Sequence, residues 1–143
     1  MKLKTGKVAF PIEFDNGEKD CIYFNPNNPD LAIRMKDFES RVNEKIKELG
    51  DIKLNAEGTP ADVVLIDQFN KIRNIVCDEL DYAFDSEISK VVFKHCSPFA
   101  IVDGEYYILA FLEAITPEIA EKAENQRNEA SKRLEKHIAK YKK

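Results

Sequence analysis

The chain has 143 residues, of which 43% are hydrophobic and 34% are charged. This length is typical of a single domain, so we expect one domain spanning residues 1–143. Only five Gly and six Pro are present, which disfavours a loop-rich sandwich or a disordered chain. The charged fraction exceeds the usual ~25%, and long solvated helix faces are the structures that most readily accommodate such a surplus.

The net charge of -4 is unevenly distributed along the chain. Residues 131–143 carry six Lys or Arg against one Glu, a local charge of +5, which leaves -9 for the rest. An acidic body disfavours general nucleic-acid binding, because neutralising phosphates needs a basic surface. A basic end can instead contact an acidic partner, or a second copy of the chain in a homo-oligomer.

The three cysteines and the N-terminal residues predict a cytoplasmic protein. An odd number of cysteines without close spacing does not form a disulfide framework, which favours a reducing compartment. The basic start of the chain has no apolar run behind it, and no window approaches the ~20 apolar residues of a membrane span. We therefore expect no membrane partner.

Alternating apolar residues at the start of the chain predict a β-hairpin within residues 1–24. Residues 7–14 place Val8, Phe10 and Ile12 on one side, and residues 19–24 form the return strand. The intervening Asn16-Gly17 pair suits the positive φ angles of a tight turn. An isolated hairpin is marginal in water, so its apolar face should rest on helices.

Residues 29–115 have the periodicity of a helical core, with an Asn-Pro start at residues 28–29 and a polar connector at residues 51–58. A further helix is expected over residues 61–84, a short one over 88–92, and an apolar one over 106–115. Thr116-Pro117 resembles another helix start, which predicts a polar C-terminal helix over 116–143 that projects or is covered by a partner. The predicted fold is α+β and mainly α: a hairpin packed on about four to five helices.

The sequence offers little for catalysis. His95-Cys96 with Cys77 is the one cluster whose composition would suit metal or thiol chemistry, but zinc sites usually present two close ligand pairs. Cys77 beside Val76 is typical of a buried thiol. No glycine-rich phosphate loop, HExxH or GxSxG motif occurs. We expect no catalytic residue, no metal and no cofactor, and therefore no enzyme.

Two features are candidates for protein binding, and each has a simpler alternative. Aromatic residues crowd into residues 93–111, where they either pack in the core or anchor a partner. The polar last helix is either solvated or engages another helix. The candidate partner-binding residues are Phe99, Tyr106, Tyr107, Phe111, Leu134, Ile138, Tyr141, Lys132, Arg133, Lys136 and Lys140.

Several stretches resemble a family of small tail-morphogenesis proteins from prophages and tailed phages of Firmicutes. They are IYFNPNNPDLAIR at residues 22–34, HCSPFA at 95–100, EYY at 105–107, FLEAITP at 111–117 and KHIAKYK at 136–142. The similarity spans most of the chain, and none of these motifs is catalytic.

The resemblance implies a tail assembly chaperone in the host bacterial cytoplasm. Such a helper binds the tape-measure protein, a very long helical chain, and the tail-tube protein during morphogenesis. Two alternatives remain open: a self-associating structural tail or head–tail component, and a nucleic-acid-linked regulator that uses the basic C-terminal residues.

Overall fold

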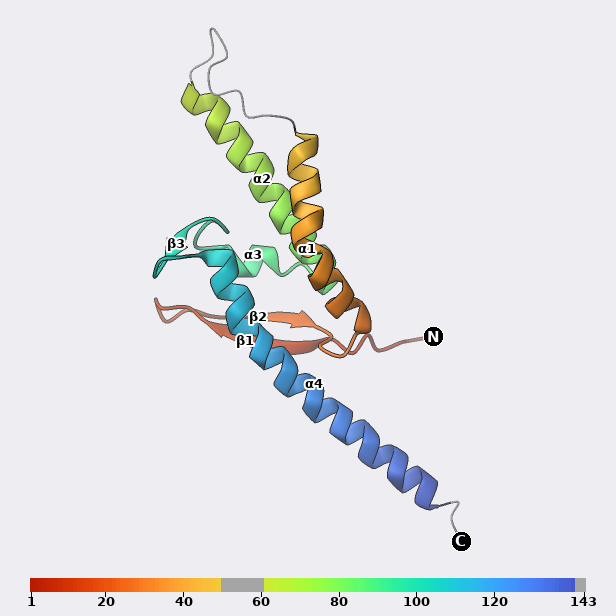
Figure 1. The fold of residues 1–143 in the computed structure, drawn as a ribbon. Coiled ribbons are helices and arrows are strands. Elements are labelled where there is room, and N and C mark those ends of the chain that lie inside the picture. The colour runs from red at the N-terminus through yellow and green to blue at the C-terminus, as the bar shows by residue number, and fades with distance from the viewer. Residues whose placement is uncertain (50–60, 141–143) are drawn as a thin grey trace.

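The structure is a computed structural model that describes residues 1–49 and 61–140. For residues 61–65 it describes the backbone but not the side chains. The chain begins with an antiparallel hairpin of β1 (Val8–Glu13) and β2 (Lys19–Phe24), which lies beneath the helices (Figure 1). Phe10 pairs with Ile22 in the register, and both are buried. The predicted hairpin is confirmed, and its inward residues face the helices as expected.

The hairpin turn differs from the prediction in one detail. The Phe14 amide donates to Glu18 O and the Gly17 amide donates to Phe14 O, each at 2.9 Å, so the loop has three residues rather than two. Gly17 has a φ of 88°, whereas Asn16 has no positive φ and instead accepts from the Glu18 amide through its side chain. A type I turn followed by a left-handed Gly has this geometry.

Helix α1 (Pro29–Glu48) begins as its sequence predicts. The Asn28 side chain accepts a hydrogen bond from the Asp30 amide at 3.0 Å, and Pro29 occupies the first helical turn, where its missing amide proton costs nothing. Leu31 and Val42 on its apolar stripe are buried. The expected connector at residues 51–58 lies outside the described residues.

Helix α2 (Ala61–Phe84) packs against α1, and ion pairs join the two helices. Arg41 donates to the buried Glu79 carboxylate, and Lys45 pairs with the same group. Among the side chains of α2 that the structure describes, those buried in the core lie in its second half: Val76, Leu80, Ala83 and Phe84. Ile66 and Phe69, nearer the start of this helix, are exposed. The expectation that the helix lies at the centre of the core therefore holds for its second half and fails at these two residues.

A short helix, α3 (Ser89–Val92), follows α2 where the sequence predicts one. The Asp81 carboxylate accepts from both the amide and the hydroxyl of Ser89 at 2.8 Å, which fixes the start of α3 against α2. A second hairpin then forms from β3 (Ile101–Val102) and β4 (Glu105–Tyr106). Its turn residues Asp103 and Gly104 have φ angles of 53° and 79°, which suits a two-residue turn.

Helix α4 (Tyr107–Ala139) runs unbroken for 33 residues, or about 50 Å. The predicted helix boundary at residues 115–116 is wrong, because Pro117 lies inside this helix. Residues on both sides of it pack on the core, so the loss of one backbone hydrogen bond, to the Glu113 carbonyl, does not end the helix. The Thr116 hydroxyl donates to the neighbouring Leu112 O at 2.6 Å. Figure 1 shows α4 crossing the first hairpin and extending beyond it.

One cluster of buried apolar side chains joins the hairpin to the helices. Phe10 and Phe24 stack with ring centroids 4.1 Å apart, and Phe24 meets Phe84 edge-on at 4.8 Å. The cluster comprises Phe10, Ile22, Phe24, Leu31, Val42, Val76, Leu80, Ala83, Phe84, Ile88, Val92, Phe93, Ile108 and Ile115. The predicted fold class, α+β and mainly α with a long C-terminal helix, is confirmed.

Candidate protein-binding surfaces

The last part of α4 leaves the body of the protein. Every side chain from residue 128 to residue 140 is exposed, and we call this segment the α4 arm. Leu134 and Ile138 lie one turn apart on it and are 59% and 43% exposed. Lys132, Arg133, Lys136 and Lys140 are exposed around them, and Tyr141 lies outside the described residues.

The arm combines an apolar stripe with a positive net charge, since it carries four Lys or Arg against two Glu. Ala130, Leu134 and Ile138 recur at a spacing of four residues, which places them along one face. An apolar stripe left exposed on a helix is the pattern by which a helix enters an apolar groove of a partner. The arm therefore has the chemistry of a binding helix as well as that of a solvated one.

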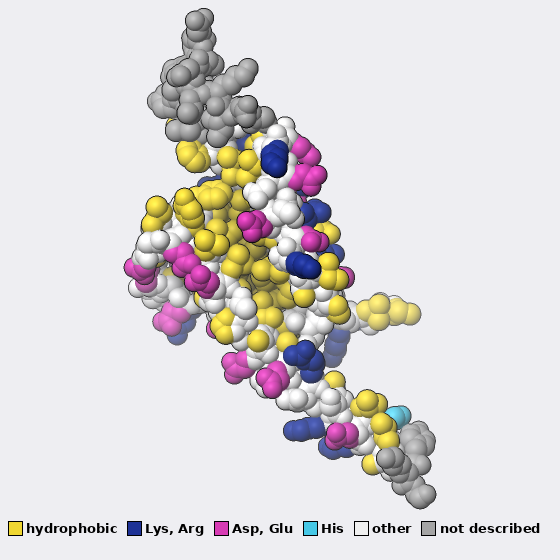
Figure 2. Space-filling view, viewed as in Figure 1, with side chains coloured by type: hydrophobic (Ala, Val, Ile, Leu, Met, Phe, Trp, Pro, Cys, Tyr) yellow, Lys and Arg dark blue, Asp and Glu magenta, His cyan; other side chains and the backbone are white. Residues whose placement is uncertain are grey.

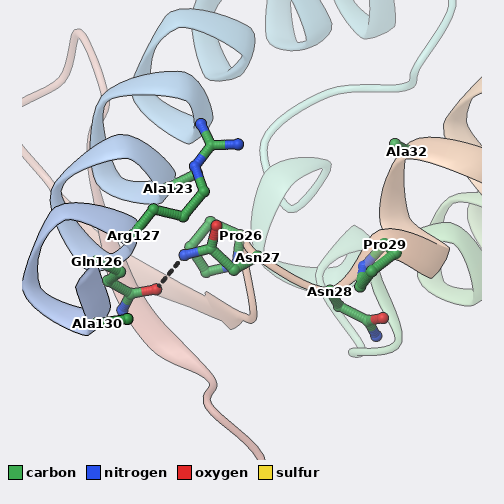
Figure 3. A pocket seen from close by; sticks show the side chains of 9 residues that line it. All are labelled: Pro26, Asn27, Asn28, Pro29, Ala32, Ala123, Gln126, Arg127 and Ala130. Atoms are coloured by element: carbon green, nitrogen blue, oxygen red, sulfur yellow. Dashed lines mark hydrogen bonds between the residues drawn. The ribbon is translucent and has the colours of Figure 1, made fainter. Parts of the chain in front are cut away.

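A groove of about 520 Å³ lies where α4 leaves the body (Figure 3). The segment between β2 and α1 forms one side, with Pro26 and Asn27, and α4 forms the other, with Ala123, Gln126 and Arg127. The Asn27 side-chain amide donates to Gln126 Oε1 at 2.8 Å. This bond ties α4 to the segment that precedes α1, just before the arm begins.

The aromatic cluster divides between packing and exposure. Tyr107 meets the buried Phe93 ring at 5.9 Å, and Phe111 meets the buried Phe84 ring at 6.1 Å. Burial raises the pKa of the Tyr107 hydroxyl. Tyr107 and Phe111 thus take part in core packing, which was the simpler of the two alternatives for the aromatic cluster.

The remaining aromatic residues belong to an exposed surface. Phe99 is half-buried and its ring meets that of Tyr106 edge-on at 6.4 Å, while Tyr106 is 51% exposed. Ile101, Val102 and Leu109 are also exposed, so an apolar patch surrounds the second hairpin. Sequence reasoning named Phe99 and Tyr106 as candidate anchors but missed Ile101, Val102 and Leu109. The Asp103-Gly104 pair, which suits a two-residue turn, was the available signal for the second hairpin.

The predicted site residues do not form one site. From Phe111 to Leu134, α4 advances 23 residues, which is about 35 Å along a continuous helix. The aromatic residues therefore lie on the body, and the basic and aliphatic ones lie on the arm. Figure 2 also shows hydrophobic side chains gathered on the face between α1 and the first half of α4.

His95 and the cysteines have ordinary structural surroundings. The His95 ring lies 2.5 Å from a Glu18 carboxylate oxygen through Nε2 and meets the Phe14 ring edge-on. Burial raises the pKa of both the Cys77 and Cys96 thiols, which disfavours the reactive thiolate. Within residues 1–49 and 61–140, no group of three or more His, Cys, Asp or Glu is placed to hold a metal ion.

A scan against protein-family models and searches of curated proteins and of solved structures found no match to this chain. Among the helices that the structure describes, none is long and apolar enough to cross a membrane.

Proposed function

We propose that this protein is a tail assembly chaperone of a tailed phage or prophage, which acts in the bacterial cytoplasm by binding and catalyses no reaction. Its clients would be the tape-measure protein and the tail-tube protein. The resemblance of residues 22–34, 95–100 and 111–117 to small tail-morphogenesis proteins supports this proposal.

The single observation that carries the proposal is the α4 arm. A helix that exposes Leu134 and Ile138 in water has an unfavourable apolar surface, which a partner helix would cover. A tape-measure protein is itself a long helical chain with apolar faces that need protection before the tube forms. The apolar face between α1 and α4 in Figure 2 offers a second surface for such a client.

The charge distribution also supports a helper of this kind rather than a nucleic-acid-linked regulator. Residues 131–143 carry a net charge of +5, while the rest of the chain carries a net charge of -9. A basic surface limited to a few turns of one helix gives few phosphate contacts. We therefore rank nucleic-acid binding below protein binding.

Co-expression with the tape-measure protein from the same phage or prophage genome tests the proposal. We expect the tape-measure protein to become soluble in the presence of this chain and to co-purify with it. Unchanged solubility without co-purification would contradict the proposal. Binding of duplex DNA at 0.15 M salt, with steep loss at higher salt, would favour the regulator instead.

A further inference from the structure

An apolar pocket opens on the body beside the first turns of α4. Its volume is about 620 Å³, within the range of ~300–1,000 Å³ typical of ligand-binding cavities. Ile12 of β1 and Phe111 and Ile115 of α4 supply apolar parts of its lining. In Figure 1 the β1–β2 turn, β3 and the start of α4 lie on the same side of the molecule, around this pocket.

The charged rim of this pocket is acidic. Glu13, Asp15 and Glu118 line it, and all three are exposed. Three cations lie nearby: Lys122 donates to a backbone carbonyl of β1, Lys94 pairs with two carboxylates of the hairpin, and Lys19 lies opposite Glu13 in the strand register. His95, which also lines the pocket, faces one of those same carboxylates. The pocket therefore presents an apolar floor and a negatively charged rim.

The α4 arm has the complementary chemistry. Leu134 and Ile138 form its apolar stripe, and Arg133 and Lys140, seven residues apart, lie along one flank of that stripe. The arm cannot fold back into its own pocket, because about 35 Å of continuous helix separates Leu134 from Phe111 in the pocket lining. If an α4 arm fills this pocket, it must therefore be the arm of another copy of the chain.

We propose that the arm of one copy docks into the acidic-rimmed pocket of a second copy. Leu134 and Ile138 enter the apolar floor, and Arg133 and Lys140 face the carboxylates of Glu13 and Glu118. This inference goes beyond the proposed function, because it needs no phage client. The contact joins two different surfaces, so repeated contacts form a closed ring or an open filament, depending on the rotation between copies. A contact of this small size gives weak association, in the micromolar range or above.

Sedimentation velocity on the purified full-length chain tests the proposal. The average mass should rise with protein concentration and fall at 1 M salt, where the Debye length shrinks to about 3 Å. An arm variant, Leu134→Ser with Ile138→Ser, and a pocket variant, Ala114→Arg, should each stay monomeric. Ala114 is an exposed helical position in the pocket lining, so Arg there blocks the pocket without disturbing the core.

Mixing the two variants gives the decisive result. The arm variant keeps an intact pocket and the pocket variant keeps an intact arm, so an equimolar mixture should form dimers and nothing larger. Ala120→Arg, which adds the same charge at an exposed α4 position outside the pocket, should associate like the unmodified chain. Circular dichroism confirms that every variant is folded.

Three outcomes would overturn the proposal. The unmodified chain could stay monomeric at every concentration and salt. The mixture of folded variants could fail to form dimers. A basic amphipathic model peptide could bind the pocket of a chain that stays monomeric, which would assign the pocket to a helix from a different protein.

Discussion

Glu79, which is only 2% exposed, accepts hydrogen bonds from Arg41 Nε at 2.6 Å and from Arg41 Nη2 at 3.3 Å, and so ties α2 to α1. Lys45 pairs with the same carboxylate. The Arg41 guanidinium also lies 4.6 Å from the centre of the Tyr82 ring, with Arg34 on that ring at 4.3 Å. A buried carboxylate with two cationic partners is thus part of the contact between the two helices.

Replacing Glu79 by Gln should lower the free energy of unfolding by about 1.5–3 kcal/mol, because it removes charge-assisted hydrogen bonds and leaves Arg41 without its counter-ion. Urea denaturation followed by circular dichroism measures this loss. The matched control is Glu87→Gln, whose exposed pair with Lys90 should contribute within about 0.5 kcal/mol. Equal effects of the two substitutions would contradict the role assigned to Glu79.

The same carboxylate predicts a pH dependence of stability. Burial raises the pKa of Glu79, but hydrogen bonds and charges from Arg41 and Lys45 lower it more, so the net pKa lies below its ordinary value of 4.5. A depressed carboxylate pKa contributes stability above pH 4.5, and this contribution is lost as pH falls through the folded-state pKa. The stability difference between the native chain and Glu79→Gln should therefore be largest near pH 7 and shrink below pH 4.5. A constant difference from pH 7 to pH 3 would contradict this account.

Phe24 should be among the most sensitive positions of the core. Its ring stacks on Phe10 and meets Phe84 edge-on, so it attaches the hairpin to α2. Phe24→Ala should cost about 3–5 kcal/mol of unfolding free energy, measured by thermal or urea denaturation. Tyr23→Ala removes an exposed aromatic ring from the same strand and should cost much less. A similar loss at both positions would show that the hairpin is not held by its inner face.

Pro117 should limit the stability of α4. Inside a helix, proline lacks the amide proton that would bond the carbonyl four residues earlier, and its ring crowds that carbonyl. Pro117→Ala should therefore raise the unfolding free energy by about 1–3 kcal/mol, measured by urea denaturation. A matched Ala at the exposed Glu121 on the same helix should change it by less than about 0.5 kcal/mol. Destabilisation by Pro117→Ala would contradict the structure of α4.

Much of the fold was predictable because local signals mark its elements. Asn28-Pro29 and Gly17 each place a cap or a turn by stereochemistry that needs no tertiary contact. The same reasoning failed at Pro117, since a proline that starts a helix and one tolerated inside it look alike in sequence. The difference lies in Ile115 and Ile119, which pack on the core on both sides. The second hairpin was missed because its strands have two residues each, too few for a periodic pattern.

The candidate sites were only partly predictable. The arm follows from periodicity and composition, so Leu134 and Ile138 could be named in advance. Which aromatic residues are exposed depends on neighbours distant in sequence, such as Phe84 beside Phe111. The acidic-rimmed pocket brings Glu13 together with Glu118, which are about a hundred positions apart in the chain. No local sequence pattern predicts that these two residues lie close together.

The central claim is that the α4 arm binds the client, and a matched pair of variants tests it most directly. In co-expression with the tape-measure protein, Leu134→Ser with Ile138→Ser should reduce the co-purified client at least tenfold, because each buried aliphatic side chain contributes about 1.5–3 kcal/mol. Ile66→Ser on α2, where the native side chain is 60% exposed like that of Leu134, should leave co-purification unchanged. Full client recovery with the folded arm variant would contradict the claim.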